Sequence, residues 1–308
     1  MKMRIGLIDV DGHNFPNLPV MKLSAYHKAR GDSVEWYDPL FSGQMDVVYK
    51  SKVFDFTPDY QYPIQADLVI RGGTGYYYPS GGPELPPDVE HIYPDYGLYD
   101  ISDTAYGFLT RGCPRGCKFC VVGSKEGRTS RKVADLSEFW RGQKVIKLLD
   151  PNLLACKGHI EILQQLVDSG AWVDFTQGLD IRLITEDNVS LLDKIKVKML
   201  HFAWDNPRQD LTQDFKRFNR LSKLRDYRKK GVYVLTNFGS TFEEDLHRIY
   251  TLRDLGFDPY VMIYDKEHAP DQIRQLQRWV NNKIIFHSGS AQTFEDYRRW
   301  QNGQKGVY

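Results

Sequence analysis

The sequence Thr110-Arg111-Gly112-Cys113-Pro114-Arg115-Gly116-Cys117-Lys118-Phe119-Cys120 brings three cysteines together in the spacing C-x3-C-x2-C. The chain of 308 residues has four cysteines in all, and the remaining one is Cys156. Three clustered thiolates are one ligand short of a closed tetrahedral zinc site or a fully ligated iron–sulfur cube. A metal centre held in this way keeps an open position, where a substrate or second ligand can bind. The stretch is therefore the candidate reactive site.

This stretch resembles the cysteine motif of the radical S-adenosylmethionine (radical SAM) superfamily, in which an aromatic residue, here Phe119, precedes the last cysteine. The flanking residues are similar to the branch that includes methylthiotransferases and enzymes with a cobalamin-binding-type N-terminal domain. The resemblance implies a 4Fe-4S cluster on Cys113, Cys117 and Cys120, with S-adenosylmethionine (SAM) on the fourth iron. It also implies reductive cleavage of SAM to a 5′-deoxyadenosyl radical, which takes hydrogen from a substrate that the sequence does not identify.

The composition is typical of a globular protein of about two domains. Hydrophobic residues make up 41% of the chain, charged residues 26%, and the net charge is +1. This balance gives no overall field to attract nucleic acid or a membrane surface. No apolar run approaches the roughly 18 residues of a membrane span, and the first residues do not read as a signal peptide. Bunched cysteines argue against a disulfide framework, so we expect a reducing, cytoplasmic location.

Residues 1–98 are predicted to form a small, Rossmann-like, cobalamin-binding-like α/β domain. Short apolar runs predict its strands. One helix is predicted at 19–30, ending at Gly31. The strands are expected at residues 4–10, 33–37 and 67–71. Gly72-Gly73-Thr74-Gly75 is predicted to be a turn, and the proline-rich residues 76–99 are predicted to be a linker without regular helix.

Residues 99–270 are predicted to form a partial (β/α)6 barrel, the fold that the resemblance implies, and residues 271–308 an extension packed on it. The barrel strands are expected at 105–110, 144–149, 173–177, 199–204, 232–236 and 259–264. The helices are expected at 158–169, 186–195, 210–229 and 242–255. In the extension we expect helices at 272–281 and 294–301 and a strand at 284–286.

Active sites of such barrels gather at the carboxyl ends of the strands. Carrying the resemblance onto these ends gives the candidate SAM contacts, although each of them alone is more readily explained as structural. They are Phe119 beside the adenine, Asp150 and Asn152 for the methionine amine, Arg182 for the methionine carboxylate with Gln177 near it after the third strand, Asp205 for the ribose, and Asn237 near the adenine. No catalytic residue is assigned.

Three further residues allow two interpretations each. His13 in Asp11-x-His13 could ligate cobalt, but Pro16 stands where the cobalamin motif has glycine, so a loop residue is favoured and cobalamin is not. Cys156 could be a substrate-side thiol, and a small buried residue is favoured. His201 could be a ligand or base, and a packed residue is favoured.

Two other functions stay open, a cobalamin-dependent radical SAM methyltransferase and a structural zinc-binding or non-catalytic Fe-S protein. The expected partners are a small-molecule or peptide substrate and an electron donor such as flavodoxin or ferredoxin. Residues 208–230 hold nine Lys and Arg, but a solvated outer helix is favoured over a nucleic-acid face. The segment after the barrel is too short for an appended RNA-binding barrel, so a nucleic-acid partner is not favoured. No membrane partner is expected either, because the sequence has no apolar run long enough to span one.

Overall fold

The computed structural model describes residues 2–12, 14–289 and 291–305. The chain divides into two compact units, Met1–Val173 and Asp174–Tyr308, and each is described by itself. The division into 1–98, 99–270 and 271–308 stays a prediction. Within the described residues, no helix combines the length and the apolar character needed to cross a membrane.

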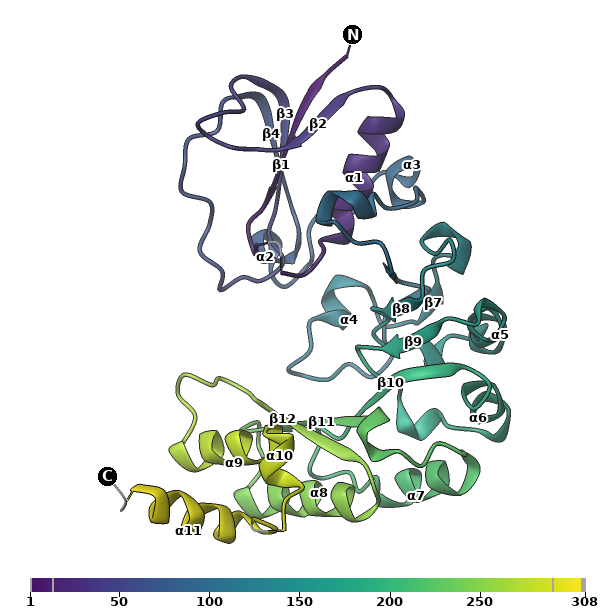
Figure 1. The fold of residues 1–308 in the computed structure, drawn as a ribbon, viewed down its shortest axis with the longest axis vertical. Helices are drawn as coiled ribbons and strands as arrows, with labels where there is room; N and C mark the ends of the chain where they lie inside the picture. The colour runs from purple at the N-terminus through teal and green to yellow at the C-terminus, as the bar shows by residue number, and fades with distance from the viewer. Residues whose placement is uncertain (1, 13, 290, 306–308) are drawn as a thin grey trace. The chain divides into compact units, whose positions relative to one another are not determined.

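The first unit begins with a four-stranded parallel sheet in the order β2-β1-β3-β4 (Figure 1). Its strands are β1 (Arg4–Asp9), β2 (Ser33–Trp36), β3 (Met45–Ser51) and β4 (Ala66–Gly72). Helix α1 (Leu18–Ala29) packs its Val20 against Ile5 and Leu7 on one face. The predicted strands and the predicted helix are confirmed, and the order is that of doubly wound α/β folds.

Strand β3 is missing from the sequence prediction. Its burial pattern explains why, because Lys50 and Ser51 are buried together with Met45 and Val48. A lysine and a serine at buried positions interrupt the apolar run that normally indicates a central parallel strand.

The prediction of a linker without regular helix was wrong. Single helical turns occur at α2 (Thr74–Tyr77), α3 (Pro87–Glu90) and the 3₁₀ turn η1 (Tyr96–Tyr99). Pro87 lies in the first turn of α3, where the absent N–H has no helical partner to lose. The turn expected at residues 72–75 likewise runs directly into α2.

The same unit contains the cysteine loop. Strand β5 (Thr104–Gly107) pairs in parallel with β8 (Val145–Leu148), and β6 (Thr110–Arg111) pairs antiparallel with β7 (Arg131–Lys132) on either side of the loop. The helical elements of this part are α4 (Val122–Lys125), η2 (Leu136–Glu138), η3 (Leu153–Ala155) and α5 (His159–Ser169).

The second unit continues the alternation of strand and helix. Its strands are β10 (Lys196–Ala203), β11 (Lys230–Thr236) and β12 (Asp258–Ile263), and the boundary between the units falls inside β9 (Trp172–Phe175). The sheet order is β12-β11-β10-β9-β8-β5. Strands β10, β11 and β12 pair in parallel, and Val232, Val234 and Val261 are fully buried.

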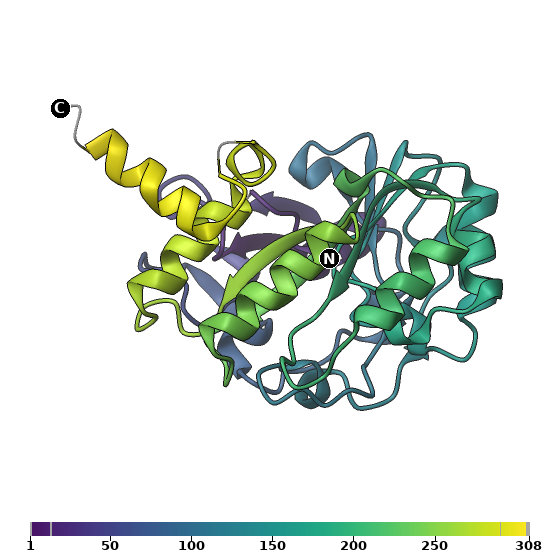
Figure 2. The same cartoon turned by 90° about the horizontal axis from the view of Figure 1, so that it is seen from below.

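The helices of the second unit lie beside its strands (Figure 1, and from below in Figure 2). They are η4 (Ile181–Leu183), α6 (Glu186–Leu192), α7 (Thr212–Leu221), η5 (Tyr227–Lys229), α8 (Phe242–Asp254), α9 (Asp271–Asn281), α10 (Lys283–Phe286) and α11 (Phe294–Lys305). Except for η4, α7, η5 and α10, these follow the predicted pattern.

Two predictions in this unit were wrong. The helix expected at 210–229 ends at Leu221, because Ser222 and Lys223 donate hydrogen bonds to Asp193 instead of continuing the helix. The strand expected at 284–286 is helix α10, whose amide of Ile285 donates to the capping Asn282 at 3.2 Å.

Candidate functional site

The cysteine loop is held by its own backbone and by one acidic side chain. The amide of Cys113 donates to the carbonyl of Gly127 at 3.1 Å, and the amide of Cys120 donates to the carbonyl of Cys117 at 3.0 Å. Glu126 accepts from the amide of Gly112 at 3.1 Å and pairs with Arg111. The loop is therefore a defined structure closed by the β6–β7 pairing.

The chemistry of the donor set fits a cluster with an open iron. All four cysteines carry thiols rather than disulfides, and Cys117 and Cys120 are exposed while Cys113 is half-buried. Within the described residues, no three His, Cys, Asp or Glu side chains converge to hold a single metal ion. Thiolates on a cube bind separate irons, so they need not converge on one point.

Gly112 permits the backbone conformation with which the cysteine loop begins. Its φ of +88° is strained for any residue with a side chain, and a Cβ there would lie 2.2 Å from the carbonyl oxygen of Thr129. Gly116, inside the loop, also has a positive φ, of +59°. The two glycines of the motif therefore serve the close folding of the loop.

Asp150 fixes the strand end that leads into the loop. Its buried carboxylate accepts hydrogen bonds from the amides of Leu109 and Thr110 and from the Thr110 hydroxyl. These bonds replace strand pairing, which is why the strand predicted at 105–110 is broken after Gly107. Burial raises the pKa of Asp150 to about 6 in spite of these bonds. The sequence analysis predicts that Asp150 contacts the methionine amine of SAM. In the structure its carboxylate contacts backbone amides and a hydroxyl of the protein.

Asn152 lies against the cysteine loop. Its side-chain Nδ2 is 3.5 Å from Sγ of Cys113, and its carbonyl accepts from the hydroxyl of Ser130 at 3.0 Å. The residue is buried. The sequence analysis predicts that Asn152 contacts the methionine amine, which stays a prediction, and the contact observed is with a cysteine sulfur. Phe119 lies half-buried within the loop.

In the second unit, Arg182 is engaged by neighbouring side chains. Its guanidinium donates to both carboxylate oxygens of Asp180, at 2.6 and 3.1 Å, and to Gln209 at 2.8 Å. The sequence analysis predicts a bidentate pair between Arg182 and the methionine carboxylate of SAM. In the structure, Arg182 makes this bidentate pair with Asp180. Gln177 is exposed just after β9.

Asp205 follows β10 and is held at the end of the neighbouring strand. It accepts from the amide of Leu235 at 3.1 Å, and burial raises its pKa to about 6. Asn237 follows β11 with a φ of +61°, and its Nδ2 donates to the carbonyl of Tyr264 at 2.8 Å. Both residues therefore lie at strand carboxyl ends, as expected.

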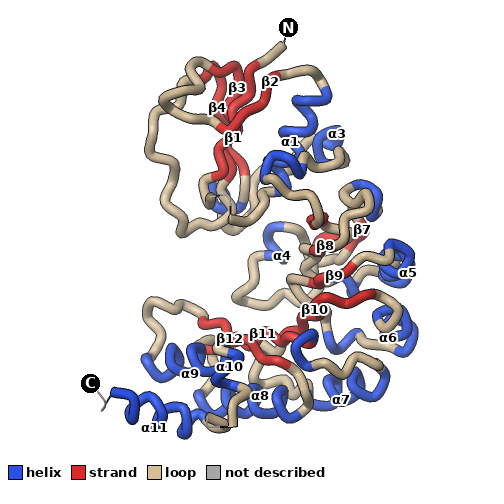
Figure 3. The backbone as a smooth tube through the Cα atoms, in the orientation of Figure 1, coloured by secondary structure: helices blue, strands red, loops and turns tan. Residues whose placement is uncertain are grey.

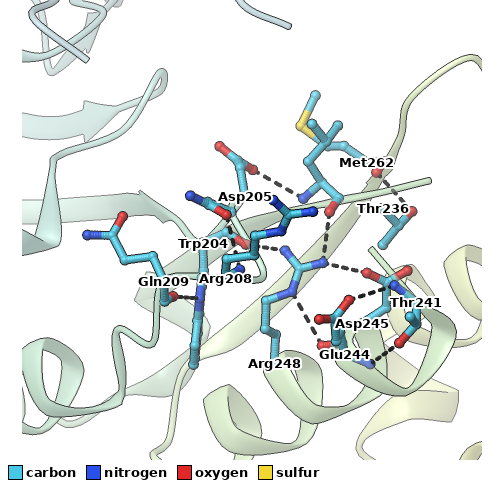
Figure 4. Close-up of polar contacts among 12 residues, drawn as sticks. Trp204, Asp205, Arg208, Gln209, Thr236, Thr241, Glu244, Asp245, Arg248 and Met262 are labelled. Carbon is cyan, nitrogen blue, oxygen red and sulfur yellow. Dashed lines mark hydrogen bonds and ion pairs between the residues drawn. The ribbon is translucent and has the colours of Figure 1, made fainter. Parts of the chain in front are cut away.

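A buried arginine that the sequence analysis missed ties these strand ends together (Figure 4). Arg248 of α8 donates to the carbonyls of Trp204 and Leu235 and pairs with Asp245. Its side chain is 1% exposed. The signal in the sequence was the i, i+3 pair of acid and base on the inward face of an amphipathic helix.

Two of the remaining candidates, Cys156 and His201, have the structural role that the sequence analysis favoured. Cys156 is buried, which confirms the small-residue interpretation. His201 stacks on Tyr233 with ring centroids 5.0 Å apart, its Nδ1 contacts the carbonyl of Phe175, and burial lowers its pKa, so it is a packed residue. His13 lies outside the described residues. Asp11 accepts from Thr57 at 2.7 Å in the loop that follows β3.

Two of the comparisons with known proteins find a similar protein, one by sequence over part of the chain and one by fold. No family model matches the chain. The tRNA-2-methylthio-N(6)-dimethylallyladenosine synthase of Christiangramia forsetii is 34% identical in an alignment of 124 residues, which covers 36% of this chain and 24% of that enzyme. The chain thus spans about a quarter of the length of this curated relative.

The fold is similar to that of TsrM, a radical SAM methyltransferase from Kitasatospora setae, in a structure with cobalamin and a 4Fe-4S cluster bound. The TM-score is 0.58 at 13% identity, covering 85% of this chain and 75% of TsrM. A second TsrM structure, with tryptophan and a SAM analog, gives a TM-score of 0.39 at 12% identity.

Proposed function

We propose that the chain is a radical SAM enzyme in which Cys113, Cys117 and Cys120 hold a 4Fe-4S cluster. The observation that carries the proposal is the loop of three thiols, braced by Glu126 and entered through Gly112. When bound, the cluster and SAM supply one-electron cleavage of the sulfonium and hydrogen abstraction from a substrate. The chain's own task is to hold the thiolates, orient SAM and exclude water.

In this proposal the strands β5 and β8–β12 form a partial (β/α)6 barrel with the site at their carboxyl ends. Asp205 would accept hydrogen bonds from ribose hydroxyls, and Gln177 and Asn237 would contact other polar groups of SAM. Arg182 would meet the methionine carboxylate while it keeps Asp180 as a partner. Asp150 would position the loop rather than contact SAM, because its oxygens already accept backbone amides. Phe119 would flank the adenine.

A second candidate is a cobalamin-dependent radical SAM methyltransferase. It is favoured by the similarity to TsrM, which extends over 85% of the chain and so reaches into the N-terminal sheet. The order β2-β1-β3-β4 leaves the carboxyl ends of β1 and β3 adjacent, where doubly wound folds bind ligands. Visible absorbance after incubation with cobalamin and desalting separates the two candidates, because the first predicts no retained cobalamin.

The test of the main proposal is anaerobic purification with measurement of iron, sulfide and zinc. We expect about four irons per chain, lost in Cys117→Ala and kept in Cys156→Ala, since Cys156 is buried outside the loop. With reductant and SAM, the loaded enzyme should release 5′-deoxyadenosine. Stoichiometric zinc without iron would support the structural zinc-binding protein, and iron without 5′-deoxyadenosine the non-catalytic Fe-S protein.

The substrate class and the electron donor are also proposals. A small molecule or a peptide is proposed as substrate, and a flavodoxin or ferredoxin as donor. The curated relative is a tRNA-modifying enzyme by name, so a tRNA is a further substrate to assay, although only 24% of that enzyme is matched.

A further inference from the structure

Strand β4 forms an edge of the N-terminal sheet and exposes apolar side chains. Leu68, Val69 and Ile70 are 52%, 38% and 39% exposed, although they lie in the middle of a strand. Within the described residues, β4 pairs with β3 alone. Exposed apolar edge strands invite pairing with another chain, and soluble proteins usually cover or charge them.

The exposed side chains lie on the face of the sheet that α1 covers only in part. Residues 52–65 between β3 and β4 run as loop (Figure 3), and their Tyr60 and Ile64 pack on the other face, against Val48. Helix α1 packs against β1. Leu68 and Ile70 lie opposite Val47 and Tyr49 of β3, so they extend the same face of the sheet beyond the part that α1 covers.

The sequence of β4, Ala-Asp-Leu-Val-Ile-Arg-Gly over Ala66–Gly72, is self-complementary about Val69. In an antiparallel pair of two copies centred on Val69, Asp67 of each copy faces Arg71 of the other. Leu68 of each copy faces Ile70 of the other, and Ala66 faces Gly72. Every position therefore meets a partner of opposite charge, of similar apolar character or of small size.

We propose that β4 is the dimerisation strand of this protein, pairing antiparallel with β4 of a second copy across a two-fold axis at Val69. Because of the two-fold axis, each contact between different residues occurs twice in the interface, as in other closed symmetric dimers. It joins two four-stranded sheets into one and places the Leu68 and Ile70 side chains of both copies side by side on one face.

The charges also exclude other arrangements. A parallel, in-register pair would place Asp67 against Asp67 and Arg71 against Arg71, and like charges directly opposite are destabilising. A shift by one residue would turn the apolar side chains to the wrong face. One strand pair buries less surface than a permanent interface, so we expect a dissociation constant in the micromolar range.

The test uses two single variants of the full chain, Asp67→Arg and Arg71→Asp, in sedimentation velocity over about 1 to 100 μM. The wild type should dimerise. Each variant alone should dimerise at least about tenfold more weakly, because both charge pairs become like-charged. Mixed one to one, the variants should form a heterodimer, since the two arginines of the first variant then face the two aspartates of the second. This recovery would also show that both variants fold.

Two control variants separate the charge pairing from local effects. Gln44→Ala removes the 2.7 Å hydrogen bond to Asp67 without changing its charge, and Glu35→Arg alters β2 at the opposite edge of the sheet. Both should dimerise as the wild type does. A wild type that stays monomeric over this range would overturn the proposal, as would a mixture of the two charge variants no more dimeric than its components.

Discussion

At the scale of single residues, the amide of Asn152 is placed to influence a cluster on the cysteine loop. Its Nδ2 is 3.5 Å from Sγ of Cys113. A hydrogen bond to a ligating sulfur stabilises the more negative, reduced cluster and raises the reduction potential. We predict that Asn152→Ala lowers the midpoint potential of the loaded protein by tens of millivolts, measured by a redox titration followed by electron paramagnetic resonance.

Ser130→Ala is the matched control for this prediction. The hydroxyl of Ser130 donates to the carbonyl of Asn152 at 3.0 Å and therefore touches the same residue without touching the sulfur. Its midpoint potential should equal that of the wild type. If Asn152→Ala had the wild-type potential as well, the hydrogen bond to Cys113 would have no electrochemical role.

Asp205 should leave a signature in the pH dependence of stability. Burial raises its pKa from 3.8 to about 6, so the folded chain binds this proton more tightly than the unfolded chain does. Its contribution to stability is therefore present at low pH and is lost as the pH rises from about 4 to about 6. Two pKa units correspond to about 3 kcal/mol. The unfolding free energy of Asp205→Asn, minus that of the wild type, should rise by about this amount between pH 4 and pH 7.

Urea denaturation at several pH values measures this difference, and Asp210→Asn tests its sign. Hydrogen bonds from Thr212 lower the pKa of Asp210, so its contribution is lost as the pH falls. The same subtraction for Asp210→Asn should therefore give a small change in the opposite direction. Parallel stability curves for Asp205→Asn and the wild type would show that the carboxylate is not buried as described.

At the scale of elements, the cysteine loop depends on the close approach of two backbone segments. Gly112 and Gly127 have φ of +88° and +91°, but only a Cβ at Gly112 would meet the carbonyl of Thr129, while nothing lies within 4 Å of a Cβ at Gly127. We predict that Gly112→Ala loses most of the bound iron and that Gly127→Ala keeps most of it. Both alanines carry the backbone strain of a positive φ, so the difference in iron content reports the clash alone. Equal losses would contradict this explanation.

The helix α8 carries a buried ion pair whose loss should be costly. Removing one partner of such a pair leaves an uncompensated charge and destabilises a protein by about 3–5 kcal/mol. We expect this cost for Arg248→Met, which strands Asp245 and frees the carbonyls of Trp204 and Leu235 (Figure 4). The double variant Arg248→Met, Asp245→Leu should recover part of it in urea denaturation. A double variant as unstable as Arg248→Met would place the cost in the two carbonyls instead.

Most helices and strands could be predicted, because their apolar residues recur with the period of a helix or form a short run typical of a buried strand. These elements also end at a glycine, a proline or a capping residue. Strand β3 could not be predicted, because Lys50 and Ser51 are buried in it. The end of helix α7 could not be predicted either, because hydrogen bonds to the distant Asp193 end the helix. The cysteines could be proposed as cluster ligands from their spacing, the glycines and the aromatic residue of the motif, and this role stays a prediction. The role of Asp150 was not, because a carboxylate after a strand can equally face a ligand or accept backbone amides.

At the scale of the whole molecule, folding and cofactor loading should be separable. Both units have fully buried cores, for example at Ile5 and Leu7 in the first and Phe202 and Trp279 in the second, whereas Cys117 and Cys120 are exposed. Small metal domains unfold without their metal because they lack such a core. We predict that removing iron with a chelator leaves the far-ultraviolet circular dichroism unchanged and raises amide hydrogen exchange only around residues 112–131.

Hydrogen exchange followed by mass spectrometry measures this, with Cys117→Ala as the reference because it cannot load a complete cluster. The wild type stripped of iron and this variant should show the same exchange pattern, since the loop in both lacks the bonds to the irons that join its three cysteines. Exchange should stay slow in β1 and β11, whose side chains lie in the cores. If iron removal instead accelerated exchange in these strands, the cluster would contribute to global folding, and the cores would not be self-sufficient.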